Sequence, residues 1–133
     1  MLVSNTLFNE KCSSLFKGYK EKISFNELKY FTAVTTLPKR MFYGCQISSI
    51  EFPKNLKHIK NRAFFKCQFD NKDFIFPDSV NSLEVNMFNY SNLRSITGNN
   101  IFYIYGNIAS SLPNLEEVNL PNLREVKISE EFP

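Results

Sequence analysis

The sequence of 133 residues contains no tryptophan, one histidine, and only four glycines and six prolines. So little glycine and proline argues against a disordered chain. No run approaches the 18 consecutive apolar residues of a membrane-spanning helix, so we expect no transmembrane segment. The N-terminus lacks a basic segment followed by a long apolar run, so we expect no secretory signal. We therefore expect a cytoplasmic protein, or a surface or secreted one if the native chain is longer.

Cysteine is also scarce, and Cys12, Cys45 and Cys67 form an odd set without an export signal. Reduced thiols are the ordinary state in such a chain. A nucleophilic pair of His58 with Cys45 or Cys67 is conceivable, as is a zinc site built from His58 and the three cysteines. However, no C-x-x-C spacing, phosphate loop or hydrolase motif is present. We predict no catalytic residue, no cofactor and no metal site.

Phenylalanine, by contrast, is abundant, and it recurs with a fixed period. The 14 phenylalanines include Phe42, Phe64 and Phe88, which follow one another at spacings of 22 and 24 residues. The phrase Ile50-Glu51-Phe52-Pro53 likewise returns as Phe74-Ile75-Phe76-Pro77. Self-similarity at 20 to 29 residues is typical of a leucine-rich-repeat solenoid. We predict such an α/β repeat fold, with phenylalanine rings stacked in its core.

Five triplets mark the predicted strands of this solenoid. They begin at Leu28, Ile50, Phe74, Ile96 and Val118, at spacings of 22, 24, 22 and 22 residues. Because strand side chains alternate, the outer residues of each triplet should face the core and the middle one should face outward. We expect about five short parallel strands joined by short helical or 3-10 turns. An abbreviated last strand is predicted at residues 126–128.

The chain divides into two predicted segments. Residues 1–27 should form an N-terminal capping helix, because apolar residues between 5 and 23 recur at three- and four-residue spacings. Such a helix would cover the core of the first coil. Residues 28–133 should form the solenoid, whose last repeats, after Gly98, are degenerate.

Two phrases, from Phe52 to Cys67 and from Phe76 to Phe88, resemble the BspA-like leucine-rich-repeat family. In that family the phrase is typically Ile-Pro-x-Ser-Val-x-x-Ile-Gly-x-x-Ala-Phe-x-x-Cys. The likeness is close over residues 28–98 and weak over residues 99–128. The family consists of binding and adhesion modules, so the resemblance implies a non-enzymatic protein–protein interaction module. The partner would be an unidentified protein.

Three candidate surfaces follow from the predicted register. A largely acidic recognition strip on the strand face would comprise Lys29, Glu51, Asp73, Ile75, Thr97, Glu117 and Asn119. A basic cluster on the opposite side, suited to anions, would comprise Lys39, Arg40, Lys57, Lys60, Arg62 and Lys66. An apolar patch at Ile101, Tyr103 and Ile104 is expected if Phe102 and Tyr105 align with Val80 and Leu83. The alternatives are solvated faces for the first two and packing into a degenerate repeat for the third.

The charge distribution supports an alternative function. The net charge is +3, yet residues 11–66 carry 12 Lys or Arg and 3 acids, whereas residues 67–133 carry 4 and 9. The basic side could bind nucleic acid or an anionic membrane. Nucleic acid is the less favoured partner, since no stacking aromatic is obvious beside the basic cluster. A cysteine-dependent enzyme is a third hypothesis, and the open edge of the last strand predicts weak self-association.

Overall fold

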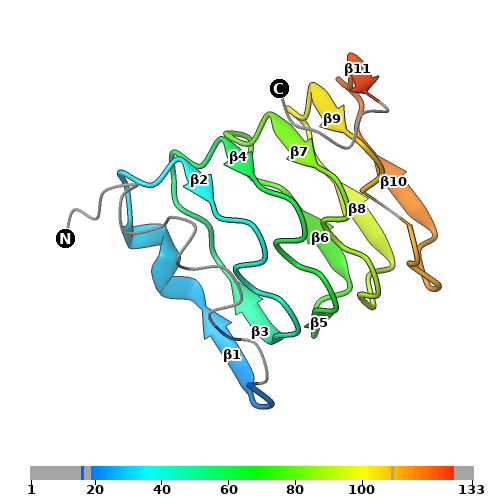
Figure 1. Ribbon diagram of the computed structural model, residues 1–133. Coiled ribbons are helices and arrows are strands. Elements are labelled where there is room, and N and C mark those ends of the chain that lie inside the picture. The colour runs from blue at the N-terminus through cyan, green and yellow to red at the C-terminus, as the bar shows by residue number, and fades with distance from the viewer. Residues whose placement is uncertain (1–15, 17–18, 109, 128–133) are drawn as a thin grey trace.

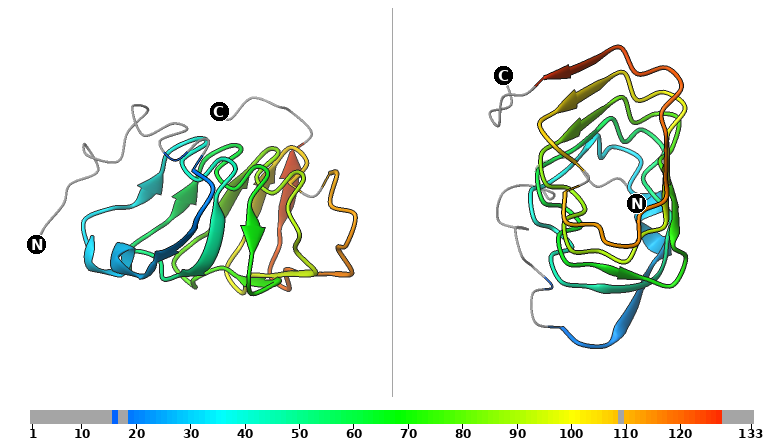
Figure 2. Two further views of the ribbon diagram at one scale, coloured as in Figure 1. Left: turned by 90° about the horizontal axis from the view of Figure 1, so that it is seen from below. Right: turned by 90° about the vertical axis from the view of Figure 1, so that its right-hand side faces the viewer.

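The computed structural model describes residues 16, 19–108 and 110–127, which wind into a parallel β-solenoid (Figure 1). The coils surround a common interior, as the right-hand view of Figure 2 shows. The strands are β1 (Lys22–Phe25), β2 (Thr36–Leu37), β3 (Gln46–Ile50), β4 (His58–Ile59), β5 (Gln68–Phe69), β6 (Asp73–Ile75), β7 (Ser82–Glu84), β8 (Ser95–Thr97), β9 (Tyr103–Tyr105), β10 (Glu117–Asn119) and β11 (Glu125–Lys127). One 3-10 helix, η3 (Asn26–Tyr30), lies between β1 and β2.

These strands form three sheets on two sides of the solenoid. On one side β2, β4, β7, β9 and β11 make a continuous five-stranded parallel sheet. On the other side β1–β3–β5 and β6–β8–β10 make two three-stranded parallel sheets. We call this second side the strand face. The solenoid of about five coils is thus confirmed, but the sequence did not indicate the five-stranded sheet.

The two edges of the solenoid turn by different means. At one edge Pro53 and Pro77 end the strand-face segments, since proline has no N–H to donate to a ladder. Their carbonyls accept hydrogen bonds from the N–H groups of Leu56 (3.1 Å) and Val80 (3.0 Å), which closes each turn. At the other edge, which we call the turn edge, the chain returns from the five-stranded sheet to the strand face.

The turn edge is built from residues with positive φ at equivalent places in successive coils. The first place holds Arg40, Arg62 and Asn86, with φ of 56°, 55° and 59°. The second, four residues on, holds Gly44, Lys66 and Tyr90, with φ of 72°, 58° and 63°. A left-handed residue interrupts any right-handed helix. The prediction of helical or 3-10 turns is therefore wrong over the described residues, where η3 is the sole helix.

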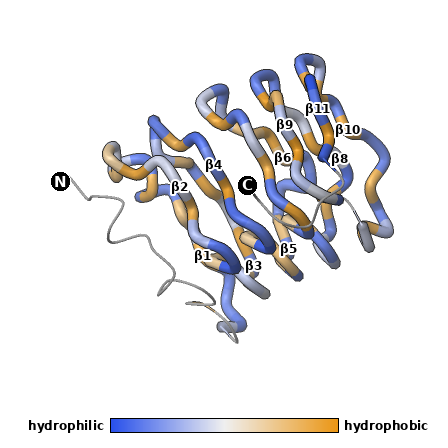
Figure 3. The backbone as a smooth tube through the Cα atoms, turned by 45° about the horizontal axis from the view of Figure 1, so that its top comes forward, coloured by the Kyte–Doolittle hydropathy of each residue, from blue (hydrophilic) through white to orange (hydrophobic). Residues whose placement is uncertain are grey.

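A column of phenylalanine rings fills the interior, as predicted. Phe42, Phe64 and Phe88 are fully buried. Their ring centroids stack at 5.1 and 5.7 Å, with interplanar angles of 9° and 15°. Figure 3 shows hydrophobic stretches recurring at the same level of successive coils. The rings thus tie each coil to the next through one continuous core.

The predicted N-terminal capping helix is not supported. Residues 1–15 and 17–18 lie outside the described residues, but Lys22–Phe25 form a strand that pairs in parallel with β3. The alternation of exposed Lys22 and Ser24 with more buried Ile23 and Phe25 suits a strand. The first predicted strand, 28–30, is η3 instead, because this coil places its strand earlier. No helix in the described part of the chain is long and apolar enough to cross a bilayer.

The 24-residue spacing between Ile50 and Phe74 coincides with the division of the strand face into two sheets. After Phe69 in β5, three residues lead to β6, which pairs with β8 and not with β3. The side chain of Asn92 occupies the open side of β5. Its Oδ1 accepts a hydrogen bond from the Phe69 N–H (2.8 Å), and its Nδ2 donates to the Phe69 carbonyl (2.9 Å). An amide side chain therefore replaces the strand that would have continued the first sheet.

Candidate functional site

The register of the second three-stranded sheet aligns the predicted strand-face residues in two rows. Ile75, Thr97 and Asn119 form one row, and Asp73, Ser95 and Glu117 form the other. Glu51, just after β3, is reached by Lys29 of η3, whose Nζ lies 3.0 Å from its Oε2. These side chains lie on one side of the solenoid, and Lys29 comes from a 3-10 helix and not from the predicted strand.

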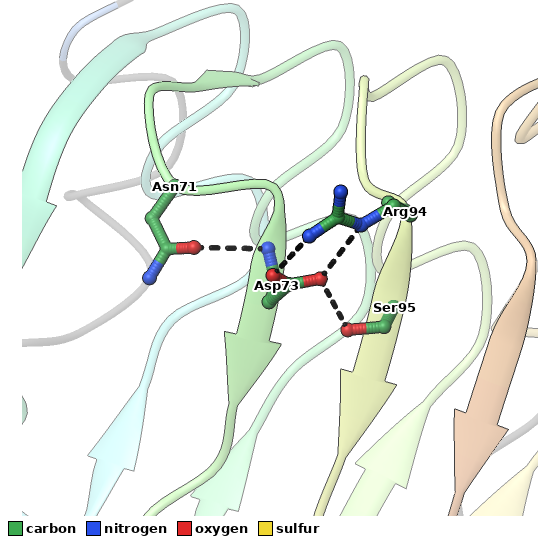
Figure 4. Close-up of polar contacts among 4 residues, drawn as sticks. All are labelled: Asn71, Asp73, Arg94 and Ser95. Atoms are coloured by element: carbon green, nitrogen blue, oxygen red, sulfur yellow. Dashed lines mark hydrogen bonds and ion pairs between the residues drawn. The ribbon is translucent and has the colours of Figure 1, made fainter.

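A polar network fixes the side chains at the centre of this face (Figure 4). Arg94 Nε donates to Asp73 Oδ1 (3.1 Å) and its Nη2 donates to Oδ2 (2.6 Å). Ser95 Oγ also donates to Asp73 Oδ1 (2.8 Å), and the Asp73 N–H donates to Asn71 Oδ1 (3.1 Å). The hydrogen bonds from Arg94, which has the larger effect, and from Ser95 lower the pKa of the Asp73 carboxyl group. The carboxylate is therefore held charged and in one orientation.

The strand face is charge-balanced where acids were expected to dominate. Lys22 pairs with Asp70 at 3.0 Å, Lys29 pairs with Glu51, and Arg94 pairs with Asp73. Exposed ion pairs of this kind add little stability, but they fix the positions of long side chains. An acidic strip is thus not what these coils present. They present cation–carboxylate pairs whose members are about one repeat apart in sequence for Lys29–Glu51 and Asp73–Arg94, and about two repeats apart for Lys22–Asp70.

A hollow lies where the strand face divides. It has a volume of about 270 Å³, and its lining comprises Ile47, Ser48, Ser49, Ile50, Phe52, Phe69, Asn71, Asp73, Phe74 and Ile75. Ile75 projects beside it with 68% of its surface exposed. Because β6 has left the ladder of β3, the strand edges on the two sides of the hollow belong to different sheets. The sequence signal for this hollow was the single 24-residue spacing.

The predicted basic cluster divides between two places. Lys57 lies exposed at the start of β4, on the side of the five-stranded sheet. Lys39, Arg40, Lys60, Arg62 and Lys66 belong to the turns that follow that sheet. Arg40 and Arg62 occupy equivalent places in adjacent coils, both half-buried, and neither forms an ion pair with any described residue. Among the residues that the structure describes, Arg40 and Arg62 therefore have no carboxylate partner.

Aromatic rings accompany these cations, although no such aromatic residue was obvious from the sequence. The rings of Tyr43 and Phe65 stack at 5.1 Å with an interplanar angle of 18°, and Tyr90 meets Phe65 edge-on at 5.4 Å. Lys66 Nζ lies 5.9 Å from both the Phe65 and the Tyr90 ring centroids. Together with the two arginines, these residues define what we call the turn strip: Arg40, Tyr43, Arg62, Phe65, Lys66 and Tyr90.

The predicted apolar patch does not form as an exposed surface. Ile101 and Ile104 are buried in the core, and Ile104 stands in register with Leu83. The repeat is therefore 21 residues long at this point, one shorter than the alignment of Tyr105 with Leu83 assumed. The half-buried neighbours Phe102, Tyr103 and Tyr105 lie outside instead. Arg124 sits 4.3 Å above the Phe102 ring and Lys127 sits 5.7 Å from that of Tyr105.

The single histidine and the buried cysteines are not neighbours. His58 Nδ1 lies 2.7 Å from Ser82 Oγ, across β4 and β7. Burial, with a smaller effect of Lys57, lowers the pKa of His58. Burial also raises the pKa of Cys45 to about 11 and that of Cys67 well above its ordinary value. A nucleophilic cysteine needs a lowered pKa, so these thiols are core residues.

A second cavity, of about 600 Å³, opens near the last described coils. Its lining comprises Val85, Asn86, Ile104, Gly106, Asn107, Ile108, Ser110 and Val126. Val126 of β11 is an exposed apolar residue at this end. Self-association through this strand stays a prediction.

The repeat phrase, the parallel coils and the phenylalanine column are features of a repeat family. The family model of the BspA type leucine rich repeat region matches residues 13–131 in six copies. The chain belongs to this family. Its BspA-type repeats include the segment of β1, in agreement with the pairing of that strand with β3. No curated protein and no solved structure matches the chain.

Proposed function

We propose that this BspA-type repeat protein is a non-enzymatic interaction module that binds a protein partner on its strand face. The observation that carries the proposal is the exposure of Ile75, 68% of whose surface is open to solvent at the centre of the face. The hollow beside it offers room for a partner side chain against Phe52 and Phe74. An apolar contact surrounded by polar groups is the usual composition of a binding hot spot.

The ordered surroundings of Ile75 favour binding further. The ion pairs Lys29–Glu51 and Asp73–Arg94 lie on the same face and hold their side chains before a partner arrives. A surface that is already ordered loses less conformational entropy on association. Membership of a family of interaction modules supports the same function.

The test compares the proteins captured from the source cell by three immobilised forms of the chain. Ile75→Glu places a charge in the proposed contact, and Thr32→Glu makes the same charge change at an exposed residue in the turn before β2. We expect at least one protein, measured by quantitative mass spectrometry, to be retained by the wild type and Thr32→Glu but lost by Ile75→Glu. Equal urea midpoints of the three forms would show that folding is unchanged. Identical protein sets for all three would refute the strand-face site.

The alternative function is binding of nucleic acid or an anionic membrane on the basic side. The observation that favours it is the pair of arginines, Arg40 and Arg62, in adjacent coils at the turn edge. Phosphate-driven binding would fall steeply as salt rises, because it releases condensed counterions. Titration of an oligonucleotide and of anionic vesicles at two salt concentrations tests this alternative directly.

A further inference from the structure

We propose that the turn strip is a second binding site, which takes an acidic segment of a protein partner. The strip lies on the turn edge, so this inference is independent of the strand-face site around Ile75. Its residues are Arg40, Tyr43, Arg62, Phe65, Lys66 and Tyr90.

The first argument is the charge of the strip. Arg40 and Arg62 hold equivalent places in adjacent coils, which in a parallel ladder are about 5 Å apart. They and Lys66 form no ion pair with any residue that the structure describes, whereas three carboxylates of the strand face are already paired. Two neighbouring guanidinium groups repel each other, and a carboxylate bound between them removes that repulsion. No carboxylate among the described residues pairs with these three cations. An anion that neutralises them would therefore come from a partner.

The second argument is the backbone that presents these side chains. Arg62, Lys66 and Tyr90 have φ of 55°, 58° and 63°, in the left-handed region that glycine and asparagine occupy most readily. The equivalent places in neighbouring coils are held by Asn86 and Gly44, so the turn itself does not require a long side chain. Backbone strain of this kind is concentrated at functional sites. Cations and a tyrosine at these places indicate a surface function.

The third argument distinguishes the kind of anion. Tyr43 and Phe65 stack face to face, so each ring covers one face of the other. Ring edges carry partial positive charge and suit carboxylate oxygens, whereas nucleic-acid bases need open ring faces for stacking. Lys66 lies within 5.9 Å of both the Phe65 and the Tyr90 ring centroids. Planar arginine groups also match carboxylates in a bidentate manner. Together these features favour an acidic peptide over a single-stranded nucleic acid.

The binding experiment uses three fluorescent probes and the full chain. The probes are a ten-residue peptide with six glutamates, the same peptide with glutamine in their place, and a single-stranded oligothymidine with six phosphates. Anisotropy is measured at low and at physiological salt. We expect the glutamate peptide to bind more tightly than the oligothymidine and the glutamine peptide not to bind. Tighter binding of the oligothymidine, or no binding of the glutamate peptide at low salt, would overturn the proposal.

Matched variants locate the site. The double variant Arg40→Asn and Arg62→Asn removes two cations. Asparagine suits both positions, because Asn86 holds the equivalent place in the next coil. We expect the affinity for the glutamate peptide to fall about tenfold or more. Lys20→Asn with Lys54→Asn removes the same charge from exposed residues outside the strip and should change the affinity less than twofold. An equal loss in both double variants would overturn the proposal, since it would indicate attraction by net charge alone.

A further variant guards against loss of folding. Lys66→Glu reverses the charge of an exposed side chain at the centre of the strip without touching the core. It should abolish binding of the glutamate peptide while leaving the melting temperature close to that of the wild type. Unchanged peptide binding in a folded Lys66→Glu protein would refute the site.

Discussion

Replacing Phe64 with alanine tests the physical basis of the fold most directly. Phe64 is fully buried in the central coil. Five other rings surround it: Phe42 at 5.1 Å, Phe52 at 6.2 Å, Phe69 at 5.8 Å, Phe74 at 5.4 Å and Phe88 at 5.7 Å. Alanine at this position would leave a cavity that joins three coils. Stiff aromatic rings held on several sides collapse into such a cavity only in part.

The expected loss is large relative to the total stability. Buried Phe→Ala substitutions cost about 3–5 kcal/mol, and the five ring contacts place this one in the upper half of that range. Domains of this size unfold with about 5–15 kcal/mol. With a urea dependence of about 2 kcal/mol per molar, a loss of about 4 kcal/mol lowers the midpoint by about 2 M. Far-ultraviolet circular dichroism of both proteins across a urea series measures that shift.

Phe102→Ala provides the control for this measurement. Its ring is half-buried on the outside of the five-stranded sheet, where Arg124 covers one face at 4.3 Å. The same deletion there should cost less than about 2 kcal/mol, because solvent already reaches the ring and no closed cavity forms. A Phe64→Ala midpoint equal to that of the wild type, or to that of Phe102→Ala, would refute the column as the main source of stability.

Three further predictions concern the thiols, the histidine and two glycines. Cys45 and Cys67 should react with a thiol reagent near pH 8 only after unfolding, because burial raises both pKa values; rapid labelling of the native protein would contradict this. Burial lowers the pKa of His58 below its ordinary 6.5, so its protonation disfavours the fold. The melting temperature should then fall as pH drops below about 6.5, and less steeply in His58→Asn. Gly98→Ala should cost about 1–3 kcal/mol, because the new Cβ would lie 2.6 Å from Ile101 Cγ1. Gly44→Ala should cost about 1 kcal/mol, because Gly44 has φ of 72° but its new Cβ would have no neighbour within 4 Å. Equal melting temperatures of the Gly98→Ala and Gly44→Ala variants would contradict the argument that crowding at Gly98 adds to the cost.

The sequence predicted the solenoid because its core obeys one period. Phe42, Phe64 and Phe88 lie in the same layer of successive coils, so equal spacing in sequence becomes contact in space. The five-stranded sheet escaped prediction because β2 and β4 contain two residues each. Two residues cannot show the alternation by which a strand is recognised. The apolar residues Leu37 and Ile59 recur at the same place in the repeat, but a single apolar residue at that place fits a turn as well as a strand.

The error at residues 101–105 has a related cause. Five consecutive apolar residues leave the register undefined, since every alignment places an apolar residue in the core. The one-residue shift of register placed Ile101 and Ile104 in the core, at the places that the sequence alignment had given to Phe102 and Tyr105. Burial of the β-branched residues leaves Tyr103 and Tyr105, whose hydroxyl groups need water or a polar partner, on the outside.

The candidate sites were predictable in position but not in chemistry. Lys29 and Glu51 are 22 residues apart, and Asp73 and Arg94 are 21 apart, so the period already places each pair in adjacent coils. An alignment by repeat position would have indicated both ion pairs and the balanced charge of the strand face. It would not have indicated that the ring faces in the turn strip cover each other. That depends on side-chain rotamers, which the repeat period does not determine.

The two proposed sites arise from opposite properties of the repeat. The turn strip depends on regularity, because only a constant spacing places Arg40 beside Arg62 and Tyr43 beside Phe65. The hollow beside Ile75 depends on a departure from it, because the longer repeat removes β6 from the ladder of β3. Asn92 satisfies the backbone groups of β5 that this departure leaves open, so the division need not expose unpaired polar groups there. A repeat protein can therefore acquire a new surface by lengthening one coil, while the core and the opposite edge retain the period that stabilises them.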